Sequence, residues 1–235
     1  MSFLLFFQRF GVMDWIGLVW FLFCWMGYER LVERGWKGHP ALLTEGHNLR
    51  LEWARQLVVR ENRIVDCALI SNIVNSVSFY ANTSIYIIAG LFATLGALDR
   101  FMDTAAELQF AHTFSREAME LKLILLVTVF VVAYFKFTWS LRQFNVLSIT
   151  TGSAPPRDGP PEVMERFARK HAAVNRCAGD DFNRGLRAYY FGLAVLAWML
   201  SAWLFILATA IVTYVQARRE FDSPVVRALR EAQVE

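Results

Sequence analysis

The chain is poor in charged residues and in cysteine, and each shortage excludes a class of protein. Asp, Glu, Lys and Arg make up only 19% of the 235 residues, whereas 56% are hydrophobic. That balance is typical of multi-pass membrane proteins and unusual for soluble domains. The net charge is only +3, and the basic residues flank apolar runs without forming one patch, which argues against nucleic-acid binding. Cys24, Cys67 and Cys177 form no C-x-x-C pair and suggest no disulfide framework.

Catalytic and cofactor motifs are also missing. The sequence contains no G-x-S-x-G, no P-loop, no dinucleotide-binding fingerprint and no H-E-x-x-H. All four histidines lie outside the apolar runs, without a suitable second ligand at helical spacing. They are His39, His47, His112 and His171. We therefore expect no enzyme, no metal site and no bound cofactor.

What the sequence does contain is four long apolar runs, at residues 10–28, 71–98, 121–141 and 188–215. Each run is long enough to cross roughly 30 Å of hydrocarbon, which takes about 20 helical residues. The first run has no basic segment before it and no small-residue cleavage site, so we expect it to be kept as an anchor. The sequence predicts an all-α fold, an integral membrane four-helix bundle, as a single transmembrane domain over residues 1–235.

The loops between the runs predict the orientation of the chain. Lys and Arg concentrate in loops 29–63 and 142–187, which by the positive-inside rule are cytoplasmic, and both termini are then outside. Each loop also carries an apolar stripe at helical spacing. The stripes consist of Trp53, Leu57 and Ile64 within His47–Asp66, and of Val163, Phe167, His171 and Val174 within Glu162–Ala178. They predict amphipathic cytoplasmic helices near the membrane surface.

The second run has an unusual number of polar side chains. Four of them follow steps of four, three and four residues and so share one helical face: Ser71, Asn75, Ser78 and Asn82. Such a face is unfavourable against lipid. Either it packs by hydrogen bonds between helices, which we favour, or it lines a pore or solute site. No Pro or Gly interrupts Ile64–Ala89, so we expect one helix that extends beyond the bilayer.

A charged cluster forms the second candidate site, at the cytoplasmic ends of the second and fourth runs. Its members are Arg60, Arg63, Asp66, Asp180, Asp181, Arg184 and Arg187. They either form a ligand or acid–base site or, as we favour, complement helix N-termini and contact lipid phosphates. Asp14 and Lys136 are charged residues near the ends of the first and third runs, and we expect both to be anchors at the membrane surface.

Several segments together resemble one known family. They are Arg63–Asp66 (RIVD), Asn75–Ser84 (NSVSFYANTS), Lys136–Asn145 (KFTWSLRQFN), Phe182–Phe191 (FNRGLRAYYF) and Arg218–Phe221 (RREF). This set resembles the membrane family catalogued as domain of unknown function 599, found in bacteria and plants. The resemblance implies a multi-pass protein of the bacterial plasma membrane, and it brings no substrate, cofactor or catalytic residue.

These features lead to one main hypothesis and two alternatives. The main hypothesis is a non-enzymatic membrane protein, a homo-oligomer or a subunit of a larger complex, with the second helix at its packing centre. The first alternative is an oligomeric ion channel or small-solute transporter lined by the polar face of that helix. The second, with least support, is an enzyme acting on lipid headgroups through Arg60, Arg63, Asp66, Asp180 and Asp181.

Overall fold

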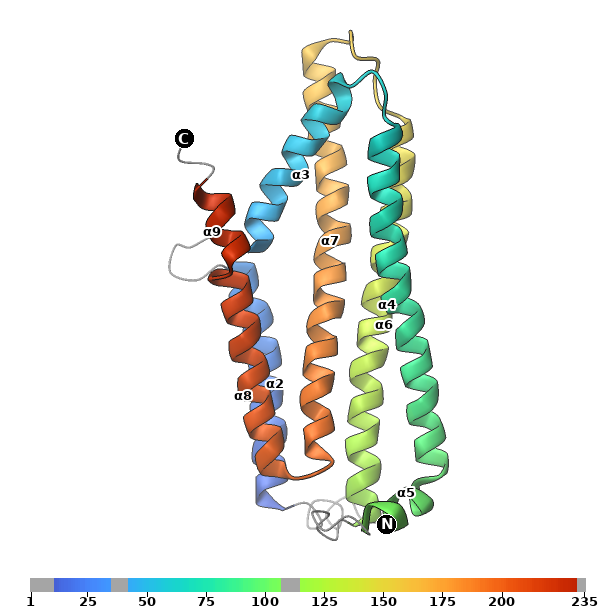
Figure 1. The fold of residues 1–235 in the computed structure, drawn as a ribbon, viewed down its shortest axis with the longest axis vertical. Helices are drawn as coiled ribbons and strands as arrows, with labels where there is room; N and C mark the ends of the chain where they lie inside the picture. The colour runs from blue at the N-terminus through green and yellow to red at the C-terminus, as the bar shows by residue number, and fades with distance from the viewer. Residues whose placement is uncertain (1–10, 35–41, 107–114, 232–235) are drawn as a thin grey trace. The chain divides into compact units, whose positions relative to one another are not determined.

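The computed structural model describes residues 11–34, 42–106 and 115–231. These residues form α-helices joined by short connections, without a β-strand among them, which confirms the all-α prediction. In chain order the helices are α2 (Val12–Arg34), α3 (Leu42–Val59), α4 (Ile64–Gly96), α5 (Leu98–Ala106), α6 (Arg116–Gly152), α7 (Pro161–Trp198), α8 (Ala202–Phe221) and α9 (Pro224–Glu231) (Figure 1). His39 and His112 lie outside the described residues.

The chain divides into two compact units. The first comprises Met1–Arg34, Ser84–Ala133 and Leu186–Arg219, and the second comprises Gly35–Thr83, Tyr134–Gly185 and Glu220–Glu235. The three longest helices, α4, α6 and α7, contribute residues to both units. Whether the two act as a single transmembrane domain stays a prediction.

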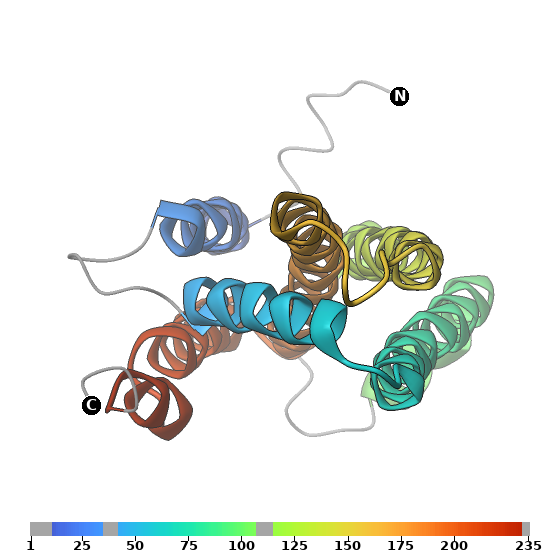
Figure 2. The same ribbon diagram turned by 90° about the horizontal axis from the view of Figure 1, so that it is seen from above.

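In the second unit, α3 crosses beside α7 and leads into α4 (Figure 2). Ala54 of α3 packs against Ala168 and Ala172 of α7; these small side chains let the two helices approach closely. Helix α9 packs against α3. The rings of Tyr80 from α4, Phe137 from α6 and Phe182 from α7 form a cluster with centroids 5.5–5.8 Å apart.

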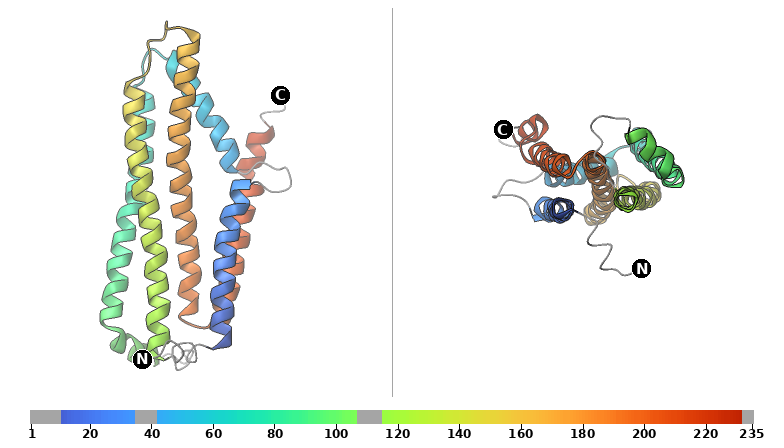
Figure 3. Two further views of the ribbon diagram at one scale, coloured as in Figure 1. Left: turned by 180° about the vertical axis from the view of Figure 1, so that it is seen from behind. Right: turned by 90° about the horizontal axis from the view of Figure 1, so that it is seen from below.

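In the first unit, α2 lies beside α8 (Figure 3). The ring of Phe21 on α2 contacts Phe205 on α8 and Phe191 on α7, with centroids 5.3 and 5.7 Å away. A separate apolar cluster joins Leu98 of α5 to Met119 and Leu123 of α6. The core of this unit is therefore built from large apolar side chains.

The structure corrects the fourth predicted span. Residues 188–215 do not form one helix, because α7 ends at Trp198 and α8 begins at Ala202. Ser201 caps the new helix, since its hydroxyl accepts a hydrogen bond from the amide of Leu204 at 3.1 Å. The carbonyl of Trp198, left without an intrahelical partner at the end of α7, accepts a hydrogen bond from Nζ of Lys122 at 3.0 Å. The apolar run at residues 188–215 therefore contains a break between two helices.

The two predicted amphipathic helices are present with different bounds. Helix α3 ends at Val59, so it does not reach Ile64, and the second predicted helix is the first half of α7. Their apolar stripes are buried only in part: Leu57 and His171 are 0% exposed, whereas Ile64 is 72% exposed. The buried stripe residues pack against neighbouring helices of the second unit.

Two described helices, α4 and α6, have the length and apolar composition of membrane spans. Only 22% of the most apolar window of α4 is buried, whereas the core helix of a soluble protein is mostly buried. Its exposed side chains include Phe79 and Tyr86. These features support a membrane location. Helix α4 is also unbroken from Ile64 to Gly96. This confirms the single helix predicted over Ile64–Ala89 from its lack of Pro and Gly, and the helix continues through Gly90.

Candidate functional site

The polar face of α4 points away from the rest of the chain. Ser71, Asn75 and Asn82 are exposed and Ser78 is half-buried, whereas Ile70, Val77 and Ala81 on the opposite side are buried. Within the described residues, none of the four polar side chains makes a hydrogen bond to another helix. Whether they meet a second protein or water stays a prediction.

The charged cluster predicted from sequence does not form one site. Asp66 is 0% exposed, and its Oδ1 accepts hydrogen bonds from Arg60 Nη1 and Trp53 Nε1, both at 2.7 Å. Asp181 lies elsewhere, about 15 Å further along α7 than His171, which contacts Trp53. The predicted cluster separates into several independent groups, each joining a different pair of elements.

Arg63 binds backbone and no carboxylate in the structure. Its guanidinium donates to the carbonyl of Leu57 at the end of α3, at 3.3 Å, and to those of Ala154 and Pro155 at 3.5 and 2.7 Å. Carbonyls at the end of a helix lack intrahelical donors. Arg63 therefore ties the end of α3 to the proline-rich turn between α6 and α7.

Asp180 and Asp181 are neighbours in sequence but face different helices, because successive residues of a helix differ by about 100°. Oδ1 of Asp180 lies 2.8 Å from Nε2 of His47 on α3. Asp181 is 10% exposed in its side chain and binds two cations, Nζ of Lys136 and Nη1 of Arg184, each at 3.3 Å. Oδ2 of Asp181 also accepts from Nε2 of Gln143 at 2.7 Å.

Lys136 of α6 is thus an ion-pair partner of α7. Arg187, the last member of the predicted cluster, belongs to the first unit and is only 7% exposed. The adjacent carboxylates therefore hold α7 to α3 through Asp180 and to α6 through Asp181. This arrangement supports packing of helices and places no free acid–base pair in a cleft.

Arg50 of α3 also lies close to α7, near the contact that Asp180 makes between these two helices. Its guanidinium lies directly over Gly179, where a Cβ atom would collide with Nη2. Burial lowers the pKa of Arg50, and the charge of Asp180 partly offsets that effect. A glycine is needed here because the arginine occupies the space of a side chain.

A surface ion pair also joins α3 and α7. Arg55 donates to both carboxylate oxygens of Glu165, at 3.0 and 2.8 Å, and Arg169 donates to the same carboxylate at 2.8 Å. These hydrogen bonds, chiefly those from Arg55, lower the pKa of Glu165 to about 2. The three residues form a bidentate bridge that sequence spacing did not predict, because Arg55 and Glu165 lie far apart in the chain.

The lowered pKa predicts how this bridge responds to acid. The folded state binds the Glu165 proton less readily than the unfolded state, so the bridge stabilises the protein above the unfolded pKa of about 4.3. That stability is lost as the pH falls toward about 2. We expect Glu165→Gln to unfold at a lower temperature than the wild type at pH 7, with a difference that shrinks below pH 4 and with added salt. A difference that is unchanged at pH 2 would contradict this assignment.

Sequence reasoning missed a buried charge cluster in the first unit. Lys122 of α6 is 0% exposed, and its Nζ lies 3.8 Å from Oδ1 of Asp14 on α2. The same Oδ1 accepts from Nε1 of Trp198 at 2.6 Å, and the ammonium lies 5.4 Å from the centre of the Trp198 ring. Asp14 is thus an internal partner within the unit. The sequence signal was the presence of one Asp and one Lys near the ends of two apolar runs.

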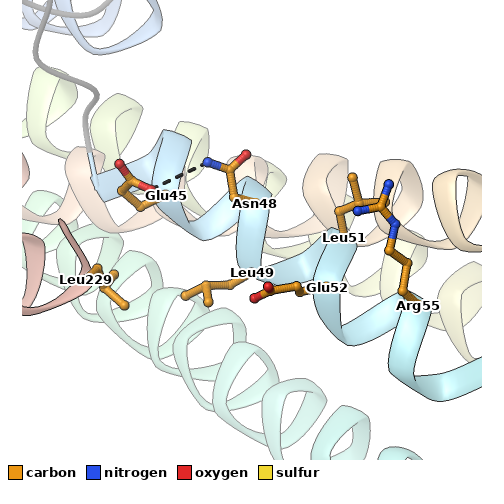
Figure 4. A pocket seen from close by; sticks show the side chains of 7 residues that line it. All are labelled: Glu45, Asn48, Leu49, Leu51, Glu52, Arg55 and Leu229. Atoms are coloured by element: carbon orange, nitrogen blue, oxygen red, sulfur yellow. Dashed lines mark hydrogen bonds between the residues drawn. The ribbon is translucent and has the colours of Figure 1, made fainter. Parts of the chain in front are cut away.

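A groove of about 330 Å³ lies between α3 and α9 (Figure 4). It is lined by Glu45, Asn48, Leu49, Leu51, Glu52, Arg55 and Leu229. Nδ2 of Asn48 lies 3.5 Å from Oε2 of Glu45. No group of three metal-ligating side chains occurs in the described part of the chain. The mixed lining of this groove points to no particular ligand.

Comparison with known proteins agrees with the resemblance noted in the sequence. The family model described as "Protein of unknown function, DUF599" matches residues 16–225. No curated protein and no solved structure matches the chain.

Proposed function

Because the chain belongs to the DUF599 family, whose model matches residues 16–225, we propose that it is a multi-pass membrane protein without enzymatic activity that assembles through α4. The observation that carries this proposal is the exposed polar face formed by Ser71, Asn75 and Asn82. In a monomer this face would meet lipid, which is unfavourable for amides. Contact with a second protein removes that penalty.

The exposed apolar side chains of other helices support more than two crossings. On α2, Val12, Val19 and Phe23 are 65–73% exposed, and on α8 Trp203 and Leu207 are 66% and 55% exposed. Lipid is the environment in which such surfaces are stable. We propose that α2 and α8 also lie in the bilayer of a bacterial plasma membrane, with loops 29–63 and 142–187 cytoplasmic and the N-terminus outside. Because α9 packs against α3 in the first of these loops, we place the C-terminus on the cytoplasmic side and not outside as the sequence predicted.

A second copy of the chain is the simplest partner for the α4 face. An asparagine side chain carries both donors and an acceptor, so the same residue in another copy is a suitable hydrogen-bond partner. The face continues on α4 through the small residues Ala89 and Ala93, which are also exposed. Small residues allow two helices to approach closely in a membrane. A different subunit of a larger complex could bind this face through the same hydrogen bonds and the same close packing at small residues.

Replacement of both amides tests the proposal. Each interhelical polar contact in a membrane contributes about 0.6–2 kcal/mol, so Asn75→Leu with Asn82→Leu should weaken self-association roughly tenfold or more. The measurement is native mass spectrometry or light scattering in mild detergent across a dilution series. Ser76→Leu is the matched control, because Ser76 is exposed on another side of α4 and gains the same apolar side chain. An unchanged stoichiometry in the double variant would refute assembly through this face.

A channel or transporter is the second candidate, because the same exposed amides would suit a hydrated path between subunits. Flux of anions, cations and small solutes into liposomes containing the purified protein discriminates the two. If Asn82→Leu abolishes a measured flux and leaves the oligomer intact, the face lines a path. If no flux is found while the double variant dissociates, the face is an assembly surface.

A further inference from the structure

Four helices of the second unit meet around a buried polar centre that no family description assigns. Trp53 comes from α3, Asp66 from α4, Thr151 from α6 and His171 from α7. Asp66 and His171 are 0% exposed and Thr151 is 3% exposed. The ring of Trp53 meets that of His171 edge to face, with centroids 6.2 Å apart, and its Nε1 donates to Asp66. The indole thus lies against both titratable groups.

The hydrogen bonds of Thr151 favour one protonation pattern of His171. The Thr151 hydroxyl lies 2.9 Å from the carbonyl of Leu147, to which it can donate its one proton. Its oxygen lies 3.0 Å from Nε2 of His171 and, in that arrangement, accepts a hydrogen bond from this nitrogen. We therefore assign the proton of neutral His171 to Nε2, which leaves an unshared electron pair on Nδ1.

Two buried acceptor atoms at this centre have no hydrogen-bond partner within the described chain, Oδ2 of Asp66 and Nδ1 of His171. The Trp53 indole contacts both groups. Leaving a buried acceptor unpaired is unfavourable. A water molecule has two protons to donate and can therefore pair with both acceptors.

We propose that Asp66 and His171 form a binding site for one proton, delivered by a water molecule held between them. A hydronium ion at this position gives its proton to Nδ1 of His171 and remains as water, and this water donates to Oδ2 of Asp66. The imidazolium then faces the carboxylate across the water. The site goes beyond assembly through α4, since its residues lie inside a single chain.

The charges around the imidazole suit a reversible proton site. Burial lowers the pKa of His171, and the carboxylate of Asp66 opposes that effect. Arg60, which binds Asp66 and is 41% exposed in its side chain, is a further charged group at this centre. The guanidinium of Arg63 binds the carbonyls of Leu57, Ala154 and Pro155 nearby. The faces of α3 and α6 contribute Trp53 and Thr151, which are uncharged at these pH values. Asp66 is therefore the group that makes proton uptake possible.

A titration of His171 followed by NMR in ¹⁵N-histidine-labelled protein tests the proposal. We expect a neutral form with the proton on Nε2 at pH 8 and a protonation midpoint below about 6.5. Asp66→Asn should lower this midpoint by about one pH unit or more, because it removes the opposite charge. His171→Gln identifies the resonance. Asp180→Asn, which removes a carboxylate elsewhere on α7, should leave the midpoint unchanged.

Arg60→Gln provides an independent test if Asp66→Asn does not fold. It removes a positive charge beside Asp66, so it should raise the midpoint of His171, opposite in sign to Asp66→Asn. Three results would overturn the proposal: no protonation of His171 before acid unfolding, a neutral form with the proton on Nδ1, or a midpoint insensitive to the substitution made at Asp66 or Arg60.

Discussion

Replacement of Gly185 by alanine is expected to lower the free energy of unfolding by about 1–3 kcal/mol, the usual effect of overpacking a buried contact. A Cβ atom at Gly185 would lie 2.5 Å from Cε1 and 2.8 Å from Cζ of Phe137. Phe137 has little room to move, because it is 0% exposed and stacks on Tyr80 with centroids 5.5 Å apart. Helix propensity alone predicts the opposite, a gain of up to about 1 kcal/mol.

The sign of the change in unfolding free energy therefore shows whether overpacking against Phe137 or the gain in helix propensity dominates. Unfolding would be followed by circular dichroism during titration with a denaturing detergent in mixed micelles. Gly27→Ala on α2 is the matched control, because nothing lies within 4 Å of a Cβ atom added there, and it should stabilise slightly. Phe137→Leu in the Gly185→Ala background should recover part of the loss, since it removes the ring that the methyl group meets. Equal signs for Gly185→Ala and Gly27→Ala would contradict the close contact between α6 and α7.

Sequence alone predicts those features of the fold and of the candidate sites that depend on residues close together in the chain. It does not predict those that depend on contacts between distant residues. Helix α4 was predictable because its apolar length and its polar face are local patterns, which Ser71, Asn75 and Asn82 display without reference to other helices. The position of His171 on an apolar stripe was also visible. Its partners were not, since periodicity identifies a face of a helix and says nothing about which helix covers it.

The features that sequence reasoning missed depend on contacts between distant residues. Asp180 and Asp181 look like one acidic pair in sequence, yet they point to α3 and α6 because of the helical rotation between neighbours. The end of α7 at Trp198 lies in an apolar run that has no Pro and whose one Gly, Gly192, precedes the break by six residues. Lys122 of another helix donates to the freed carbonyl of Trp198. Such a break is stabilised by tertiary contacts. Its only local sequence signal is Ser201, which can cap the next helix.

The buried charge cluster at that helix end gives the prediction with the largest expected effect. Asp14→Ala removes the carboxylate that lies 3.8 Å from Nζ of Lys122 and also the acceptor for Trp198 Nε1. Lys122 is 0% exposed, so its charge loses this opposite charge in a poorly solvated place. Removing one partner of a buried ion pair costs about 3–5 kcal/mol, and we expect a loss of that size in the same micelle titration.

An exposed ion pair in the same unit supplies the control for this experiment. Arg116 lies 2.9 Å from Asp99, with side chains 57% and 78% exposed, and surface pairs contribute about 0–1 kcal/mol. Asp99→Ala should therefore change stability little. Lys122→Met added to Asp14→Ala should restore much of the loss, because an apolar side chain then replaces the buried charge. The carbonyl of Trp198 loses its donor in this variant, so recovery stays incomplete. If Asp14→Ala costs no more than Asp99→Ala, the pair does not hold α2, α6 and the end of α7 together.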